Sequence, residues 1–239
     1  MISSTLERKA MRQEVQIPVG SARLTGQLTL PSEVIGCVLF AHGSGSSRLS
    51  PRNQYVARVL SNNGMATLLF DLLTGDEGRE DQRSAAYRFD MGLLTHRLIG
   101  ATEWVRQQPA TQALSLGYFG ASTGAAAALR AAAEKGNRIH AVVSRGGRPD
   151  LAGPVLKQVH CPTLLIVGAL DTEVVALNQS AFARLDCLKE LKLIPGATHL
   201  FDEPGTLDHV ASLASGWFRR HLLDVLNTEE NGNSTWPNP

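Results

Sequence analysis

Continuous apolar runs, separated by stretches of helical spacing, constrain the fold of this chain more than any other feature. Strands that are apolar on both faces belong to a parallel sheet covered by helices on each side. The runs that predict such strands are Cys37–Ala41, Ala66–Phe70, Leu116–Phe119, Ala141–Ser144 and Thr163–Val167. A last run, Leu191–Ile194, predicts an edge strand.

The beginning of the chain has a different pattern. Polar and apolar residues alternate in Glu14–Val19 and Ala22–Leu30, on either side of Gly20-Ser21, which predicts a hairpin of half-exposed strands. Helical patterns fill the gaps between the later runs, at Pro51–Asn62, Asp90–Gln108, Ser122–Lys135, Glu173–Leu185 and Thr206–Leu223. The alternation predicts one doubly wound α/β domain over residues 14–223, with about eight mostly parallel strands. Residues 1–13 are expected to form an N-terminal segment, and residues 224–239 a flexible tail.

Composition excludes several classes of protein. The 239 residues carry 23 Lys and Arg against 22 Asp and Glu, so no single-sign field favours nucleic acid. The longest apolar runs reach about half a membrane span, and the first residues lack the apolar stretch of a secretory signal. Three cysteines, Cys37, Cys161 and Cys187, form neither a disulfide framework nor a C-x-x-C metal clip. We therefore expect a cytoplasmic globular protein with no metal, no membrane partner and no nucleic-acid partner.

Gly120-Ala121-Ser122-Thr123-Gly124 directly follows a predicted strand and opens a predicted helix. A serine on such a sharp turn has its hydroxyl pushed out at the top of the sheet, and the flanking glycines allow close backbone packing. The motif alone also arises by chance in a chain rich in glycine and serine. Its position between strand and helix favours a nucleophile, Ser122.

A serine nucleophile needs a base, and the base needs an orienting carboxylate. In sheets of this kind the order along the chain is serine, acid, histidine. Asp171 follows the apolar strand that ends near Val167, and His199 follows the last strand. The alternatives are a helix N-cap for Asp171 and a plain loop histidine for His199. Agreement of three placements in order favours a catalytic triad.

The loop Ala41-His42-Gly43-Ser44-Gly45 follows the first central strand. An amide of this loop is expected to complete an oxyanion hole, and we assign that role to Ser44, with Thr123 supplying the other amide. The glycines of the loop are equally typical of tight turns. His42 is expected to brace the loop, since a base there would have no orienting acid.

Together these motifs resemble the α/β-hydrolase superfamily, and within it the dienelactone hydrolase-like branch, from about Glu14 to Leu223. The resemblance implies an α/β-hydrolase fold and hydrolysis of small esters or lactones through an acyl-enzyme, with no cofactor. Dienelactone hydrolases proper carry a cysteine nucleophile, whereas position 122 is serine. That departure favours a generic carboxylesterase. Relatives of this branch can be joined to a phosphoribosyltransferase domain.

The surroundings of the predicted site are expected to be open. Only 14 residues separate Gly147 from Pro162, too few for a large cap domain. The charged segment Thr74–Arg88 is expected to be a loop, either one wall of the site or simply solvated.

Three arginines are candidates for recognising an acidic substrate. Arg145 and Arg148 follow a predicted strand at its carboxyl end, where ligands bind in such sheets, and Arg48 follows the oxyanion loop. The alternative for each arginine is a structural salt bridge.

The sequence therefore predicts a serine hydrolase acting on a small-molecule ester or lactone, with Ser122, Asp171 and His199 as the triad. Two alternatives stay open: a non-catalytic small-molecule binding protein of the same fold, and an acyltransferase or perhydrolase that uses the same triad. The natural substrate and the choice between monomer and homodimer are also open.

Overall fold

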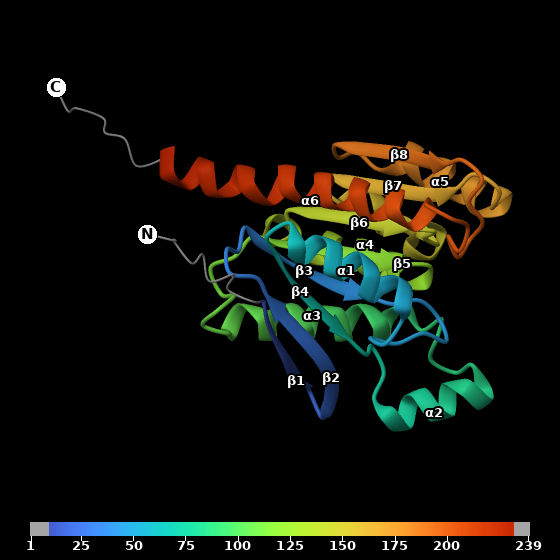
Figure 1. Cartoon of the computed structure of the whole chain (residues 1–239). Helices are drawn as coiled ribbons and strands as arrows, with labels where there is room; N and C mark the ends of the chain where they lie inside the picture. Colours follow the sequence, from blue (N-terminus) through green and yellow to red (C-terminus); the bar gives the residue numbers. More distant parts are fainter. Residues whose placement is uncertain (1–9, 232–239) are drawn as a thin grey trace.

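An eight-stranded sheet runs through the computed structural model, which describes residues 10–231 and the side chains of residues 10–223 (Figure 1). The strand order is β1-β2-β4-β3-β5-β6-β7-β8. The strands are β1 (Met11–Val19), β2 (Ala22–Leu30), β3 (Gly36–Ala41), β4 (Met65–Phe70), β5 (Leu116–Ala121), β6 (Ala141–Arg145), β7 (Thr163–Gly168) and β8 (Lys189–Ile194). The pairs β1–β2 and β2–β4 are antiparallel, and all other pairs are parallel.

The burial of each strand follows its sequence pattern. The last five residues of β1 alternate between buried and exposed, as expected for a strand with one solvated face. Every residue of β3, β4, β5, β6 and β7 is buried. The continuous apolar runs therefore form the centre of the sheet, and the alternating runs form one edge.

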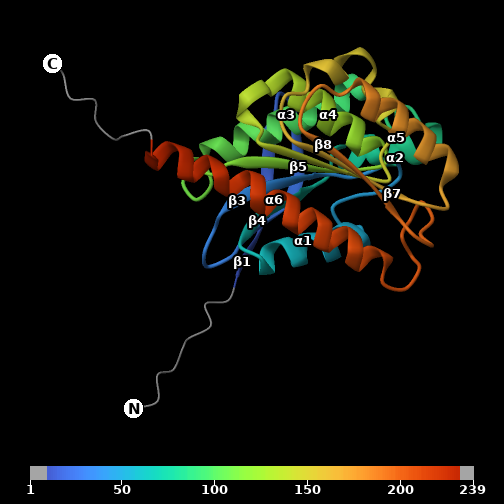
Figure 2. The same ribbon diagram turned by 90° about the horizontal axis from the view of Figure 1, so that it is seen from above.

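Helices cover both faces of the sheet (Figure 2). The helices are α1 (Pro51–Asn62), α2 (Gly75–Ser84), α3 (Met91–Gln107), α4 (Thr123–Lys135), α5 (Thr172–Arg184) and α6 (Thr206–Asn231). Helices α1 and α6 pack on one face, while α3, α4 and α5 pack on the other. Each face has its own hydrophobic core, so the strands between them are dry on both sides.

The predicted fold class is confirmed, because a mostly parallel sheet carries helices on both faces. The connection from β6 to β7 consists of a short 3-10 segment, η2 (Pro149–Gln158), and its flanking turns, so the described chain has no large cap domain. Strand β1 begins three residues before Glu14. No helix among the described residues is both long and apolar enough to span a membrane.

The last helix also differs from its predicted bounds. Helix α6 continues to Asn231, past the predicted end at Leu223. The rest of the predicted tail, residues 232–239, and the first nine residues of the predicted N-terminal segment lie outside the described residues.

The segment Thr74–Arg88 differs most from expectation, because most of it is helix α2 and not a loop. The Thr74 hydroxyl accepts the Glu77 backbone N–H, and the Glu77 carboxylate accepts the Thr74 backbone N–H at 2.7 Å. This reciprocal capping box stabilises the start of a helix that has almost no apolar residues. Helix α2 lies at one side of the molecule, away from the other helices (Figure 1).

Candidate active site

Ser122 occupies the single-residue turn between β5 and α4, in a backbone conformation that side chains rarely adopt. Its φ is 50° and its ψ is −122°. Such a conformation costs about 1–3 kcal/mol and persists only when the surroundings hold it. Here the Ser122 amide donates to the Arg145 carbonyl at 3.2 Å, and its carbonyl accepts from the Arg148 amide at 3.1 Å.

Two glycines flank this turn, and the turn can form because neither has a side chain. Their neighbours lie too close for a Cβ atom at either position. A Cβ on Gly120 would lie 2.4 Å from the Ala125 Cα, and a Cβ on Gly124 would lie 2.2 Å from the Ala41 carbonyl oxygen. Both contacts are far inside van der Waals distance and involve backbone that cannot easily move. Helix α4 therefore begins directly under the β3 and β5 strand ends, with Ser122 at its N-terminus.

His199 and Asp171, the other two residues of the predicted triad, are in direct contact. Nδ1 of His199 lies 2.7 Å from Oδ2 of Asp171. Asp171 precedes α5, yet its side chain makes no capping hydrogen bond to that helix. The N-cap alternative therefore does not describe its side chain, which faces the histidine instead.

Backbone contacts hold the Asp171 and His199 loops together. The Leu170 amide donates to the Ala197 carbonyl at 2.9 Å, and a Cβ on Gly168 would lie 2.4 Å from the Thr198 carbonyl oxygen. Glu203 accepts the Thr198 amide at 3.2 Å and also its hydroxyl, and the Thr198 hydrogen bond lowers the pKa of the Glu203 carboxyl. These bonds fix the turn that presents the imidazole.

The turn after β6 contacts both parts of the predicted triad. Arg145, the last residue of β6 before this turn, accepts the Ser122 amide through its carbonyl. The next residue is Gly146, whose Cβ, if present, would lie 3.6 Å from Cε1 of His199. Ser122 and His199 thus flank one short backbone segment, and the structure brings all three predicted triad residues to the same edge of the sheet.

The predicted oxyanion loop lies against Ser122. A Cβ on Gly43 would lie 3.0 Å from the Ser122 Cβ, so a side chain there would press on the serine. The Ser44 and Thr123 hydroxyl oxygens lie 3.0 Å apart, and the Ser44 hydroxyl also donates to the Arg88 carbonyl at 3.3 Å. These contacts join the loop to the start of α4.

His42 braces this loop, as the sequence predicts. Its Nε2 accepts the Leu72 amide at 3.0 Å, which leaves Nδ1–H to donate to the Gly43 carbonyl at 2.9 Å. Burial lowers the pKa of His42, and this favours the neutral ring that the two bonds require.

Two of the three candidate arginines are held in salt bridges, the alternative that the sequence left open. Arg148 binds Asp150 through two parallel bonds of 2.9 and 2.8 Å, which raise the pKa of Arg148. Arg48 pairs with Asp71, whose carboxylate also accepts the Arg48 amide at 2.7 Å.

The side chain of Arg145 is buried on the face of the sheet that α1 and α6 cover. Its guanidinium donates to Oδ1 of Asn53 at 3.3 Å and lies 5.7 Å from the centre of the Phe201 ring. Burial, with a smaller contribution from the neighbouring Arg52 guanidinium, lowers the pKa of Arg145 to about 10. The side chain therefore packs against the segment that follows His199, and its contact with an acidic substrate stays a prediction.

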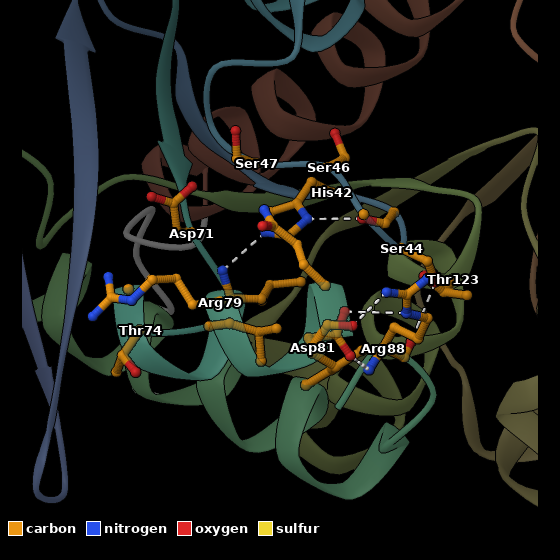
Figure 3. A pocket seen from close by; sticks show the side chains of 18 residues that line it. His42, Ser44, Ser46, Ser47, Asp71, Thr74, Arg79, Asp81, Arg88 and Thr123 are labelled. Carbon is orange, nitrogen blue, oxygen red and sulfur yellow. Dashed lines mark hydrogen bonds and ion pairs between the residues drawn. The ribbon is translucent and has the colours of Figure 1, made fainter. Parts of the chain in front are cut away.

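A cavity of about 290 Å³ lies between the oxyanion loop and α2 (Figure 3). Helix α2 forms one wall, as the sequence had allowed for this segment. The lining residues are His42, Gly43, Ser44, Gly45, Ser46, Ser47, Asp71, Leu72, Leu73, Thr74, Gly75, Gly78, Arg79, Asp81, Gln82, Arg88, Leu94 and Thr123. In the described part of the chain, no group of three or more metal-ligating side chains is present.

Sequence reasoning missed two carboxylates near the site. Asp81 is buried and accepts the Tyr87 and Arg88 amides at 2.9 and 2.8 Å, which shapes the segment that follows α2. Glu203 holds the His199 loop. The capping pattern Thr74-x-x-Glu77 could have revealed α2, whereas no sequence signal identifies the partners of Asp81 or Glu203.

Comparison with known proteins places these features in a family. The model of the dienelactone hydrolase family matches residues 26–227. Two Mycobacterium tuberculosis proteins, both named "Putative phosphoribosyl transferase", are 56% identical over 210 residues. The match covers 88% of this chain and 46% of each relative, so the chain spans about half the length of the curated proteins it matches.

Solved structures agree with the family match. A dienelactone hydrolase from Anabaena variabilis is 55% identical, with a TM-score of 0.88, over 89% of this chain and 99% of the other. Est1E from Butyrivibrio proteoclasticus shares the fold at 15% identity, with a TM-score of 0.74 and coverage of 87% and 98%. These matches confirm the α/β-hydrolase fold and the predicted branch. The chain belongs to the dienelactone hydrolase family.

Proposed function

We propose that this chain hydrolyses small carboxylic esters or lactones through an acyl-enzyme formed on Ser122. The observation that carries the proposal is the 2.7 Å contact between His199 and Asp171, at the sheet edge where Ser122 occupies its strained turn. Membership of a hydrolase family supports the reaction class. The substrate class and the residue roles are our inference.

The first step is attack by the Ser122 hydroxyl on the carbonyl carbon. Nδ1–H of His199 donates to Asp171, so the Nε2 lone pair can accept the serine proton. The bond from Oγ to carbon forms while the carbonyl π electrons move onto oxygen. Asp171 keeps the ring in the required tautomer and stabilises the imidazolium that results.

The negative charge on the carbonyl oxygen needs donors that are already in place. The Thr123 amide at the N-terminus of α4 and the Ser44 amide of the loop pressed against Ser122 are our candidates. Helix α4 adds the positive end of its dipole at the same point. Gly43 permits the close approach that this arrangement needs.

The intermediate then collapses, and the bond to the alcohol oxygen breaks. Nε2 of His199 returns the proton to the leaving alcohol, or to the ring-opened oxygen of a lactone. Water, deprotonated by the same imidazole, attacks the acyl-enzyme and releases the acid and free Ser122. These steps need neither a metal nor an organic cofactor.

The name of the M. tuberculosis relatives does not alter this proposal. Their match and the hydrolase family model both cover most of this chain, so the two matches overlap. The chain accounts for 46% of each relative. We infer that the shared part is the hydrolase unit and that phosphoribosyl transfer belongs to the rest of those proteins.

Pre-steady-state hydrolysis of p-nitrophenyl acetate tests the proposal. We expect a burst of p-nitrophenol equal to one molecule per active site, followed by slower turnover, since the activated p-nitrophenyl leaving group makes acylation faster than deacylation. Ser122→Ala should abolish both phases. Ser212→Ala, which changes an exposed serine of α6, is the matched control and should behave as wild type.

The same assay separates the two alternatives that the sequence left open. A non-catalytic binding protein would give no turnover with either variant or with wild type. An acyltransferase or perhydrolase would show faster p-nitrophenol release when an alcohol or hydrogen peroxide is added, with the acyl group recovered on that acceptor and not as free acid.

A further inference from the structure

The cavity beside α2 lies on one side of Ser122, and His199 lies on the other. Strand order gives the arrangement: the cavity follows the ends of β4 and β3, Ser122 follows β5, and His199 lies over Gly146 at the end of β6. Ser44 and Thr123, the candidate oxyanion residues, line the cavity at its end nearest the nucleophile.

This arrangement determines which part of an ester could enter the cavity. His199 must reach the leaving oxygen to return its proton, so the alcohol part of the substrate belongs on the His199 side. The carbonyl oxygen is directed to the two amides. The remaining substituent of the carbonyl carbon, the acyl chain, then extends toward β3 and β4, where the cavity begins.

The size and the lining of the cavity limit that acyl chain. A volume of about 290 Å³ is at the lower end of the roughly 300–1,000 Å³ typical of ligand pockets. Eleven of the 18 lining residues carry polar side chains and three are leucines. A short acyl chain that carries a polar group fits this lining better than a long alkyl chain.

The charges of the lining are paired with each other or with close neighbours. Arg88 binds the buried Asp81 at 3.1 Å, and Arg79 pairs with Asp76 one helical turn away on α2. The carboxylate of Asp71 forms a salt bridge with Arg48. Because these charges are balanced locally, the lining favours a neutral polar group over a charged one.

Hydroxyl groups of the lining keep a proton to donate. The Ser47 oxygen accepts the Leu49 amide at 3.1 Å, and the Thr74 oxygen accepts the Glu77 amide at 3.3 Å. Each of these bonds uses an oxygen lone pair and not the hydroxyl proton. A hydroxyl on the acyl chain could accept from such groups.

Gly78 lies in the middle of the α2 face that lines the cavity. Thr74, Gly78 and Gln82 follow one another at helical spacing, and all three line it. A Cβ on Gly78 would meet no heavy atom within 4 Å, and its backbone is helical. A larger side chain at this position would therefore enter the cavity without straining the fold.

Building on the proposed ester hydrolysis, we propose that this cavity is the acyl pocket, that it accepts short hydroxyacyl groups, and that Gly78 sets its size limit. Three methyl esters with the same leaving group test this: methyl acetate, methyl 3-hydroxybutanoate and methyl 3-methylbutanoate. The last two differ only by a hydroxyl in place of a methyl group. Rates are followed by acid release at constant pH.

Wild type should prefer the hydroxybutanoyl ester to the methylbutanoyl ester by about 2- to 10-fold in kcat/KM, the range expected of one net hydrogen bond. In Gly78→Leu, the ratio of kcat/KM for the hydroxybutanoyl ester to that for the acetyl ester should fall by about 10-fold or more. Gly216→Leu, at an exposed helical glycine of α6 that also faces open space, should keep the wild-type ratio.

The outcomes separate this inference from the proposed function. No turnover of any of the three esters by wild type contradicts both. Turnover with an unchanged ratio in Gly78→Leu overturns the acyl pocket and leaves ester hydrolysis standing. An equal or greater rate for the methylbutanoyl ester overturns the hydroxyacyl class. Should Gly78→Leu fold poorly, Gly78→Ala should shift the ratio in the same direction by a smaller factor.

Discussion

The turn that contains Ser122 and helix α2, which lines the cavity, differ in how deeply their residues are buried. Around Ser122, β5 is entirely buried, and residues 123–129 at the start of α4 are also buried. In α2 only Asp81 is buried, and most of its other side chains are charged. The proposed chemistry thus depends on a tightly packed region in which an added Cβ atom would clash. The cavity is lined by a peripheral helix in which a larger side chain at Gly78 would meet no neighbouring atom.

We expect different residues to determine the rate of the reaction and the choice of acyl group. The residues around Ser122, the proposed nucleophile, are fixed by backbone contacts, so substitutions there should affect both stability and turnover. Residues of α2 contact the core little, so substitutions there should affect the choice of acyl group. The following predictions test that contrast, from the largest expected effect to the smallest.

Asp171→Asn should lower kcat by about 10⁴-fold, because the amide favours the wrong tautomer of His199 and cannot stabilise the imidazolium. Substrate binding should change little, since Asp171 lies behind the histidine. The measurement is steady-state hydrolysis of p-nitrophenyl acetate. Asp186→Asn, at an exposed position after α5, is the control. A loss of less than tenfold in Asp171→Asn would contradict the triad.

Gly124→Ala should destabilise the fold by about 3 kcal/mol or more, because the added Cβ would lie 2.2 Å from the Ala41 carbonyl oxygen. Activity should fall with it, since helix α4 would have to move away from the strand ends. Urea unfolding measures the change in free energy. Wild-type stability in this variant would show that the turn is looser than its contacts indicate.

The pH dependence of stability should report on His42. Burial lowers its pKa in the folded state, so as the pH falls below about 6.5 the unfolded chain binds a proton first. The free energy of unfolding should therefore decrease toward acid pH, although the hydrogen bond to the Gly43 carbonyl and, to a smaller extent, the nearby Asp71 oppose the lowering of the pKa.

Thermal unfolding of wild type between pH 5 and pH 8 (about the range in which histidine titrates) measures this dependence. His42→Gln should flatten the acid side of the curve, at some cost in overall stability. His96→Gln, at an exposed position of α3, is the control and should follow wild type. Equal slopes for all three proteins would assign the acid sensitivity to other groups.

Gly78→Ala should stabilise the protein by about 0.5–1 kcal/mol, since alanine favours a helix over glycine and the added Cβ meets open space. A glycine-to-alanine substitution should therefore lower the free energy of unfolding at position 124 and raise it at position 78. Urea unfolding of the two variants side by side measures the difference directly. Destabilisation at Gly78 would mean that α2 packs more tightly than its contacts show.

The sequence predicted the sheet well because the strands depend on local patterns, while the catalytic role of the triad stays a prediction. Continuous apolar runs identified the central strands, and the order Ser122, Asp171, His199 placed the three residues at one sheet edge. Helix α2 escaped prediction because hydrophobic periodicity cannot reveal a helix without an apolar face. The reciprocal bonds of Thr74 and Glu77 supply the missing signal.

The arginines show where sequence reasoning stops. Arg148 and Arg48 stand at positions suited to a ligand, yet Asp150 and Asp71 hold them. Arg145 belongs to a strand buried on both faces, and its side chain points to the α1 and α6 side, where it meets Asn53. The direction of a side chain at the end of a strand, and the partner it finds, depend on distant segments that the sequence pattern does not place.

The central claim is that Ser122 becomes acylated, and mass spectrometry of the quenched enzyme tests it most directly. Wild type mixed with p-nitrophenyl acetate and quenched in acid during the burst should carry one acetyl group, on the peptide that contains Ser122. Ser122→Ala treated in the same way should carry none. An acetyl group on another residue, or turnover by wild type with no adduct and no burst, would contradict the account.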